Sequence, residues 1–503
     1  MKRGFKITII SFAIAGILAS QNGWADQTSS TSDLEQRLDN LESQVADLKQ
    51  QLQDQKQQEA QNAQQAAQAP GVIASAPAYV TANSKDGFAF KSADGDFSLK
   101  IGGYTQFLAR DFGSSDKEDL QSDHGSNTSY GEDDAFLARR VRLIIQGTVA
   151  HDFDYYLQPE LGYNNALSSI TSTSPSAYSP ALQDAWIDWK YFPDFTIKAG
   201  KFKTPFDLEN LQDTRVTDFV ELGLTGNLTP QRDIGVQAGG NLYFDWISYA
   251  AGIFNGAADH ENPYGGSSTA GYENGNATGV GRIFATPFKD TSIKPLQGLG
   301  VGYAVSYGKE KGSDIPASYV TTGQAPFFSY NSGVANDGPQ LRTEPQAFYY
   351  YKSLGILGEK INDYESLEYT ANSHIYRDKP DNHAFNVEAS YVLTGENASY
   401  NGVTPKNNFN PGKGTWGAFE VVGRYGELKL DDSIFSEGFA SESTSASEAR
   451  AWSTGLNWYL NSNAKLVFDY EQTKFDDGAA AGVNGGNRKT ENLFLTMLQL
   501  SIG

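Results

Sequence analysis

Short segments in which apolar and polar residues alternate recur along most of this chain. We count sixteen, at 97–109, 136–149, 154–164, 182–191, 195–201, 233–244, 246–254, 278–287, 299–308, 344–352, 354–364, 383–393, 415–425, 450–460, 464–474 and 491–502. Alternation with a period of two gives a β-strand one apolar and one polar face. An even strand number is typical of bacterial outer-membrane barrels. The pattern predicts an all-β fold, and together with the connection lengths, the N-terminal signal and the motifs described below it predicts a 16-stranded antiparallel transmembrane β-barrel.

The connections between these segments alternate between short and long. The gaps 192–194 and 461–463 are short, whereas 202–232 and 309–343 are long. Short periplasmic turns opposite long external loops are a property of such barrels. One connection, 394–414, is long on the side where the turns should be short, and the sequence offers no physical reason for it.

The parity of the segments predicts which side chains face the lumen. Arg140 and Arg142 alternate with Val141 and Leu143, which places the two arginines inside and the aliphatic residues against lipid. A soluble β-sandwich would also alternate, although its inner face would be apolar. Alternation alone does not separate these two folds.

The N-terminal part differs in composition from the rest of the chain. Residues 1–25 have the charged start and apolar core of a secretory signal peptide. Residues 26–69 form a coiled-coil and Gln/Ala-rich segment, in which Leu and Val at 3.5-residue spacing over 32–54 predict oligomerisation. Residues 70–85 are a linker, and 86–503 form the barrel. The formal net charge of -21 argues against nucleic acid as a partner.

The sequence shows no recognisable catalytic or metal-binding pattern. It has no cysteine, and its five histidines are scattered without ligand spacing. No catalytic motif and no glycine-rich phosphate loop is present. We therefore expect no enzyme activity, no catalytic residue, no metal and no cofactor.

Several motifs resemble one known family of proteins. The central ones are GKFKTPFDLEN from Gly200, FVELG from Phe219 and QRDIGVQAGG from Gln231, flanked by RRVRLIIQGTV from Arg139 and WGAFEVVGRYGELKLD from Trp416. Together they resemble the phosphate-selective porins O and P. The resemblance implies a trimeric outer-membrane porin whose third external loop, 202–232, folds into the barrel and narrows it.

The resemblance also implies passive diffusion of small anions, phosphate first, with outer-membrane lipid and two further copies of the chain as partners. The residues expected to line the pore and bind anions are Arg139, Arg140, Arg142, Lys198, Lys201, Lys203, Arg215 and Arg232. Basic side chains at a constriction raise the local anion concentration and replace part of the hydration shell. The arginine fork also matches two phosphate oxygens.

Two alternatives stay open from the sequence alone. The third loop carries five acids, namely Asp207, Glu209, Asp213, Asp218 and Glu221. If these oppose the arginines of the wall, the protein is a general diffusion pore without strong anion selectivity. The second alternative is a structural tether, in which the periplasmic coiled coil binds another envelope component.

Overall fold

The computed structural model describes residue 50 and residues 79–83, 86–113, 134–162, 181–256, 277–314, 318–371, 373–478 and 489–503. The chain divides into two compact units, Met1–Ala76 and Pro77–Gly503, and the second contains all of the strands. The predicted signal peptide and, apart from residue 50, the predicted coiled coil lie outside the described residues. No helix of the described part is long and apolar enough to cross a membrane.

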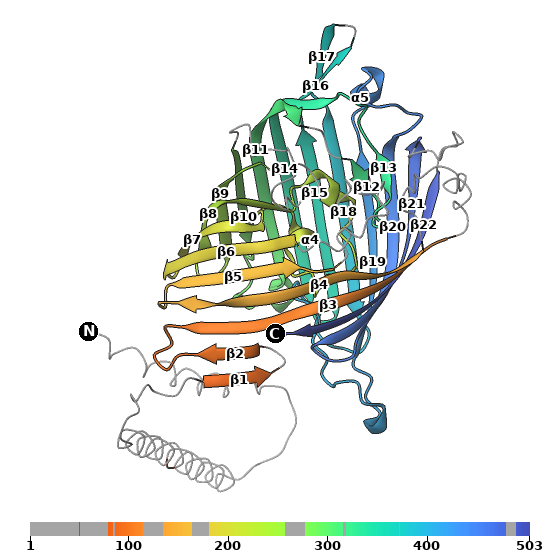
Figure 1. Ribbon diagram of the computed structural model, residues 1–503. Helices are drawn as coiled ribbons and strands as arrows, with labels where there is room; N and C mark the ends of the chain where they lie inside the picture. Colours follow the sequence, from red (N-terminus) through yellow and green to blue (C-terminus); the bar gives the residue numbers. More distant parts are fainter. Residues whose placement is uncertain are drawn as a thin grey trace. The chain divides into compact units, whose positions relative to one another are not determined.

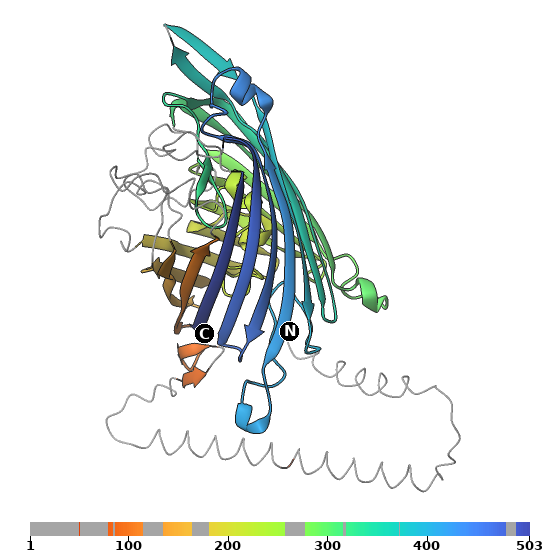
Figure 2. The ribbon, with the colours of Figure 1, turned by 90° about the vertical axis from the view of Figure 1, so that its right-hand side faces the viewer.

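Sixteen antiparallel strands close into a barrel (Figure 1 and Figure 2). They are β3 (Ser98–Phe112), β4 (Ala135–Val149), β5 (Phe153–Glu160), β6 (Ala181–Phe192), β7 (Phe195–Lys203), β8 (Arg232–Leu242), β9 (Ile247–Phe254), β10 (Thr278–Ala285), β11 (Leu299–Asp314), β14 (Ala335–Tyr351), β15 (Leu354–Tyr364), β18 (Asp381–Val392), β19 (Ala418–Lys429), β20 (Ala446–Tyr459), β21 (Ala464–Asp477) and β22 (Thr490–Ile502). Pairing of β22 with β3 closes the ring. The predicted barrel and its strand number are confirmed, and a barrel of this size leaves room for an aqueous channel.

A short hairpin continues the sheet beside the closing seam. Its strands are β1 (Tyr79–Asn83), within the stretch predicted as linker, and β2 (Gly87–Lys91). Strand β2 pairs with the start of β3, and β22 pairs with the remainder, so Phe88 lies opposite Ile101 and Ile502 opposite Gly103. A Cβ on Gly102 would lie 2.4 Å from the Ile502 carbonyl oxygen. The seam therefore needs a residue without a side chain.

The two faces of the barrel have opposite polarity. On β19, Val421 and Tyr425 are 39% and 44% exposed on the outside, whereas Glu420 and Arg424 are buried inside. The other strands follow the same rule, with Ile187 on the outer face of β6. An apolar exterior around a charged interior is the reverse of a soluble sandwich, and it suits lipid outside and water inside.

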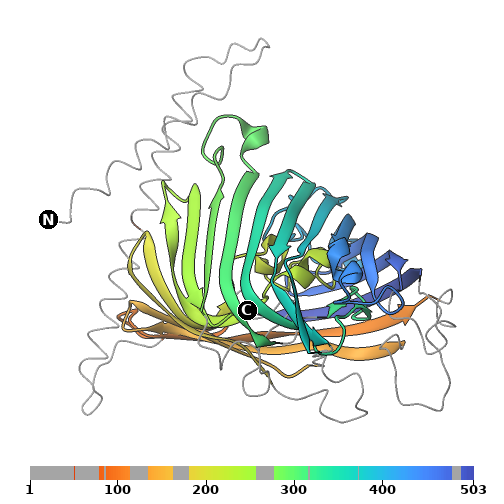
Figure 3. The ribbon, with the colours of Figure 1, turned by 90° about the horizontal axis from the view of Figure 1, so that it is seen from above.

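Two external loops fold into the lumen. The third loop, residues 204–231, contains the helices α4 (Leu208–Leu211) and η3 (Leu224–Leu228), which lie inside the ring of strands (Figure 3). Residues 318–334 also enter the lumen, and they contain the short strands β12 (Tyr319–Val320) and β13 (Pro326–Phe328). The Asn227 side-chain amide exchanges two hydrogen bonds of 2.9 Å with the backbone of Val320. The sequence did not predict this second loop.

Outside the ring, the described part also contains η4 (Lys294–Leu296), the hairpin of β16 (Leu367–Ala371) and β17 (His374–Asp378), and α5 (Asp432–Ser436).

The long connection 393–417 supports the third loop from the opposite end of the barrel. It contains η5 (Pro411–Lys413) and joins β18 to β19. The Tyr400 hydroxyl donates to the Leu208 carbonyl at 2.6 Å, and the Gln212 side chain donates to the Tyr400 carbonyl at 3.0 Å. The Tyr400 ring also stacks on Phe348 with 5.2 Å between centroids. The extra length of this connection thus places the partly buried Tyr400 against α4 and supports the helix.

Tyr400→Phe removes the hydroxyl and keeps the ring. A neutral hydrogen bond stabilises by roughly 0.5–1.5 kcal/mol, so the undocked population of the third loop should rise about two- to tenfold. We expect more flicker in single-channel recordings from planar bilayers, without loss of folded barrel. Tyr391→Phe, on the exposed outer face of β18, is the control and should behave as wild type. Identical recordings from Tyr400→Phe and wild type would contradict this role.

Candidate anion-binding site

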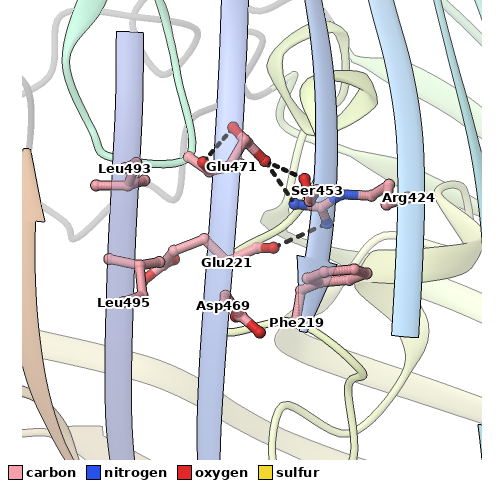
Figure 4. Close-up of a pocket in the computed structure, with 9 residues that line it drawn as sticks. Phe219, Glu221, Arg424, Ser453, Asp469, Glu471, Leu493 and Leu495 are labelled. Atoms are coloured by element: carbon pink, nitrogen blue, oxygen red, sulfur yellow. Dashed lines mark hydrogen bonds and ion pairs between the residues drawn. The ribbon is translucent and has the colours of Figure 1, made fainter. Parts of the chain in front are cut away.

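The third loop is docked tightly against one wall of the lumen. Arg424 of β19 lies 3.0 Å from Glu209 of the loop, and 3.3 and 3.4 Å from Glu388 and Glu471 of the wall. Its guanidinium also lies 4.4 Å from the centroid of the Phe219 ring. Figure 4 shows the ion pair between Arg424 and Glu471. The cavity that these residues line has a volume of only about 10 Å³, so the described loop and wall residues pack closely here.

Carboxylates of this wall receive hydrogen bonds from the backbone of the loop. The Leu208 amide donates to Glu344 and Glu359 at 3.1 and 3.0 Å, and the Val220 amide donates to Asp469 at 3.0 Å. A buried backbone N–H group without a hydrogen-bond partner is costly. In this loop, carboxylates of the wall are the partners of the Leu208 and Val220 amides. The wall acids therefore position the loop.

The acids of the loop are also engaged. Glu221 accepts from Arg139 at 2.6 Å and from Arg140 at 2.8 Å. The register of β3 and β4 shifts between Gln106 and Phe107, which leaves Arg139 without an opposite residue. Such a bulge re-aims side chains, and here two consecutive arginines reach the same carboxylate.

Two further acids of the loop differ in their charge, since Asp213 is ionised and balanced by a neighbouring arginine whereas Glu209 is partly neutral. Burial opposes ionisation of Asp213, but the hydrogen bonds and charge of Arg215, 2.6 Å away, outweigh it and lower the pKa of that carboxyl. Burial, reinforced by Glu388, raises the pKa of Glu209 to about 8. Glu209 therefore contributes less negative charge at neutral pH than a free carboxylate would.

A cavity of about 420 Å³ lies on the other side of the loop. Its wall comes from β3 to β10 and its opposite side from loop residues such as Pro205 and Gln212. Five basic residues and two acids line it, namely Arg142, Lys198, Lys203, Arg232, Arg282, Asp184 and Asp213. The third loop thus divides the lumen into a closed acidic side and an open basic side.

Two of the five basic residues are paired with acids. Arg142 lies 2.6 Å from Glu160, and Arg232 lies 3.2 Å from Asp184. Their positive charge is largely balanced within the wall.

The other three basic residues have no carboxylate oxygen within 4.0 Å among the described residues. Lys203 donates to the carbonyls of Asn210 and Gln212 at 2.5 Å. Arg282 donates to the Gln346 side chain at 2.8 Å, and Lys198 lies 4.3 Å from the Trp186 ring centroid. Basic groups that lie beside a cavity without an ion-pair partner can attract a hydrated anion.

The structure separates the residues predicted from the sequence into two groups. Arg142, Lys198, Lys203 and Arg232 line the cavity. The other four hold structure together: Arg139 and Arg140 bind Glu221, Arg215 binds Asp213 and the Gly503 carbonyl, and Lys201 donates to the Leu182 carbonyl at 2.8 Å.

Sequence reasoning placed Arg424 in the lumen but did not predict its contact with the third loop, and it did not include Arg282 among the pore-lining residues. Arg282 lies in the alternating segment GVGRIFA, where Ile283 is exposed on the outer face and Arg282 therefore points inward. Parity could have identified it. In the part of the chain that the structure describes, no group of His, Asp and Glu residues could hold a metal ion.

Comparison with known proteins agrees with this architecture. The family model for phosphate-selective porin O and P matches residues 114–502. Porin O of Pseudomonas aeruginosa is 25% identical over 424 residues, which are 79% of this chain and 88% of that protein. The outer-membrane channel DcaP of Acinetobacter baumannii has the same fold at 12% identity, with a TM-score of 0.51 and coverage of 82% of this chain and 99% of that one. The chain therefore belongs to the phosphate-selective porin O and P family of outer-membrane porins.

Proposed function

We propose that the protein lets small anions, phosphate first, diffuse passively across the outer membrane through the basic cavity. The observation that carries this proposal is the set of three cations, Lys198, Lys203 and Arg282, that face the cavity without a carboxylate partner among the described residues. Membership of the family supports the choice of phosphate.

In this mechanism an anion exchanges part of its hydration shell for donors on the wall and on the loop. Arg282 can donate more than one hydrogen bond to phosphate oxygens, whereas lysine acts as a point charge. Passage also requires that no single site holds the anion too strongly. The hydrogen bonds that Lys203 and Arg282 make to neutral groups hold both side chains in place at the cavity.

The geometry argues against a general diffusion pore. Such a pore needs loop acids facing wall arginines across the water. Here Glu209 and Glu221 are instead buried against Arg424 and the pair Arg139 and Arg140, and of the five loop acids only Asp213 lines the cavity. The electrostatic potential in the passage is therefore mainly positive.

Lys198→Gln and Arg282→Gln remove one uncompensated cation each. A hydrogen bond to a charged group contributes roughly 1.5–3 kcal/mol, so the phosphate concentration that halves the chloride current should rise about 10- to 100-fold in each variant. Purified protein in planar bilayers gives this measurement. Lys360→Gln, on the exposed outer face of β15, is the control and should leave the phosphate titration unchanged. An unchanged titration in both cavity variants would refute the proposal.

We also propose that residues 1–25 are removed on export and that residues 26–69 and 70–85 lie in the periplasm as a coiled coil and a linker. The heptads at 32–54 support self-association, and the family resemblance favours three copies. Sedimentation equilibrium in detergent should give the mass of a trimer. Deletion of residues 26–69 should weaken the trimer and leave the conductance of each barrel in place. A monomeric full-length protein would exclude the trimer.

A further inference from the structure

Trp186 is an aromatic residue on the polar face of its strand. Ile187 and Trp189 lie at the alternate positions of β6 that face outward, whereas Trp186 lines the cavity together with Tyr156. We propose that this cavity takes organic anions that carry an aromatic ring, of which an aryl phosphate is the simplest case. This inference rests on the proposed function, because it requires that anions enter the cavity.

The two rings form a parallel stack beside the passage. Tyr156 and Trp186 stack with 5.2 Å between centroids and 3° between ring planes. They lie opposite each other in neighbouring strands, and the same row continues with Gly200 and Gly235. Because Gly200 and Gly235 follow Trp186, no side chain in this row covers the face of the Trp186 ring that points away from Tyr156. Offset contact with a further aromatic ring is favourable in such a place.

A cation lies directly beside this surface. The Lys198 ammonium is 4.3 Å from the centroid of Trp186 and 5.5 Å from that of Phe202. Arg282 lines the same cavity. The strand residues between Lys198 and Arg282 include Gly239, Ala250 and Gly252, whose small size leaves space for a ligand above the strands. A molecule with an anionic group and a flat apolar group can thus engage a cation and a ring simultaneously.

The size of the cavity agrees with such a ligand. A water molecule takes about 30 Å³ in the liquid, so 420 Å³ is far more than one phosphate fills. Pockets for small organic ligands start at roughly 300 Å³. The volume thus admits a phosphate ester with an aromatic ring, and the two lumen-facing rings supply its apolar contact.

The test compares phenyl phosphate with inorganic phosphate as blockers of chloride current in planar bilayers, at a pH where both are dianions. For wild type, phenyl phosphate should halve the current at about five- to tenfold lower concentration than inorganic phosphate. Trp186→Leu should reduce this advantage to about twofold without changing the block by inorganic phosphate. Trp189→Leu, the same change on the outer face of the same strand, should keep the advantage.

Each other outcome has a definite meaning. Equal block by both probes in wild type overturns the aromatic site and leaves the anion passage in place. Absence of block by either probe overturns the proposed function as well. Equal weakening of both probes in Trp186→Leu means that the ring only shapes the cavity, which also overturns the proposal. If Trp186→Leu yields no folded barrel, Tyr156→Leu makes the same test.

Discussion

The contact between Arg424 and the third loop determines where water and ions can go in this barrel. One guanidinium bridges Glu209 of the loop and two carboxylates of the wall. Removing one partner of such a buried group is costly, since the remaining charges stay buried without compensation. Backbone amides of the loop add hydrogen bonds to Glu359 and Asp469 on the same wall. The loop is consequently part of the wall on that side.

This docking explains how a chain with 60 acidic and 39 basic residues can offer a positive passage. Many acids of the lumen are used to hold the loop, and Tyr400 of the connection 393–417 supports the loop from below. What remains open is the side where Lys203 and Arg282 face the cavity. Net charge of the whole chain is therefore a poor guide to its selectivity, because local pairing decides which charges an ion meets.

Much of the fold could be predicted from the sequence, because lipid and water impose a strict period of two on every strand. The sixteen strands and the inward position of Glu420 and Arg424 follow from that rule alone. The wall that receives the loop could not be predicted, since Glu209 and Arg424 are 215 positions apart. The bulge at Arg139 likewise depends on pairing between strands, and two consecutive arginines there reach Glu221. Four of the eight predicted basic residues line the cavity, and the other four make contacts within the protein.

The most direct measurement of the central claim is the zero-current potential of the wild-type protein in a planar bilayer under a tenfold KCl gradient. If the acids of the lumen are engaged in holding the loop, the zero-current potential should lie close to the chloride equilibrium potential. A potential near zero or of the opposite sign would mean that the loop acids act on the passage, and it would contradict the division of the lumen into an acidic closed side and a basic open side.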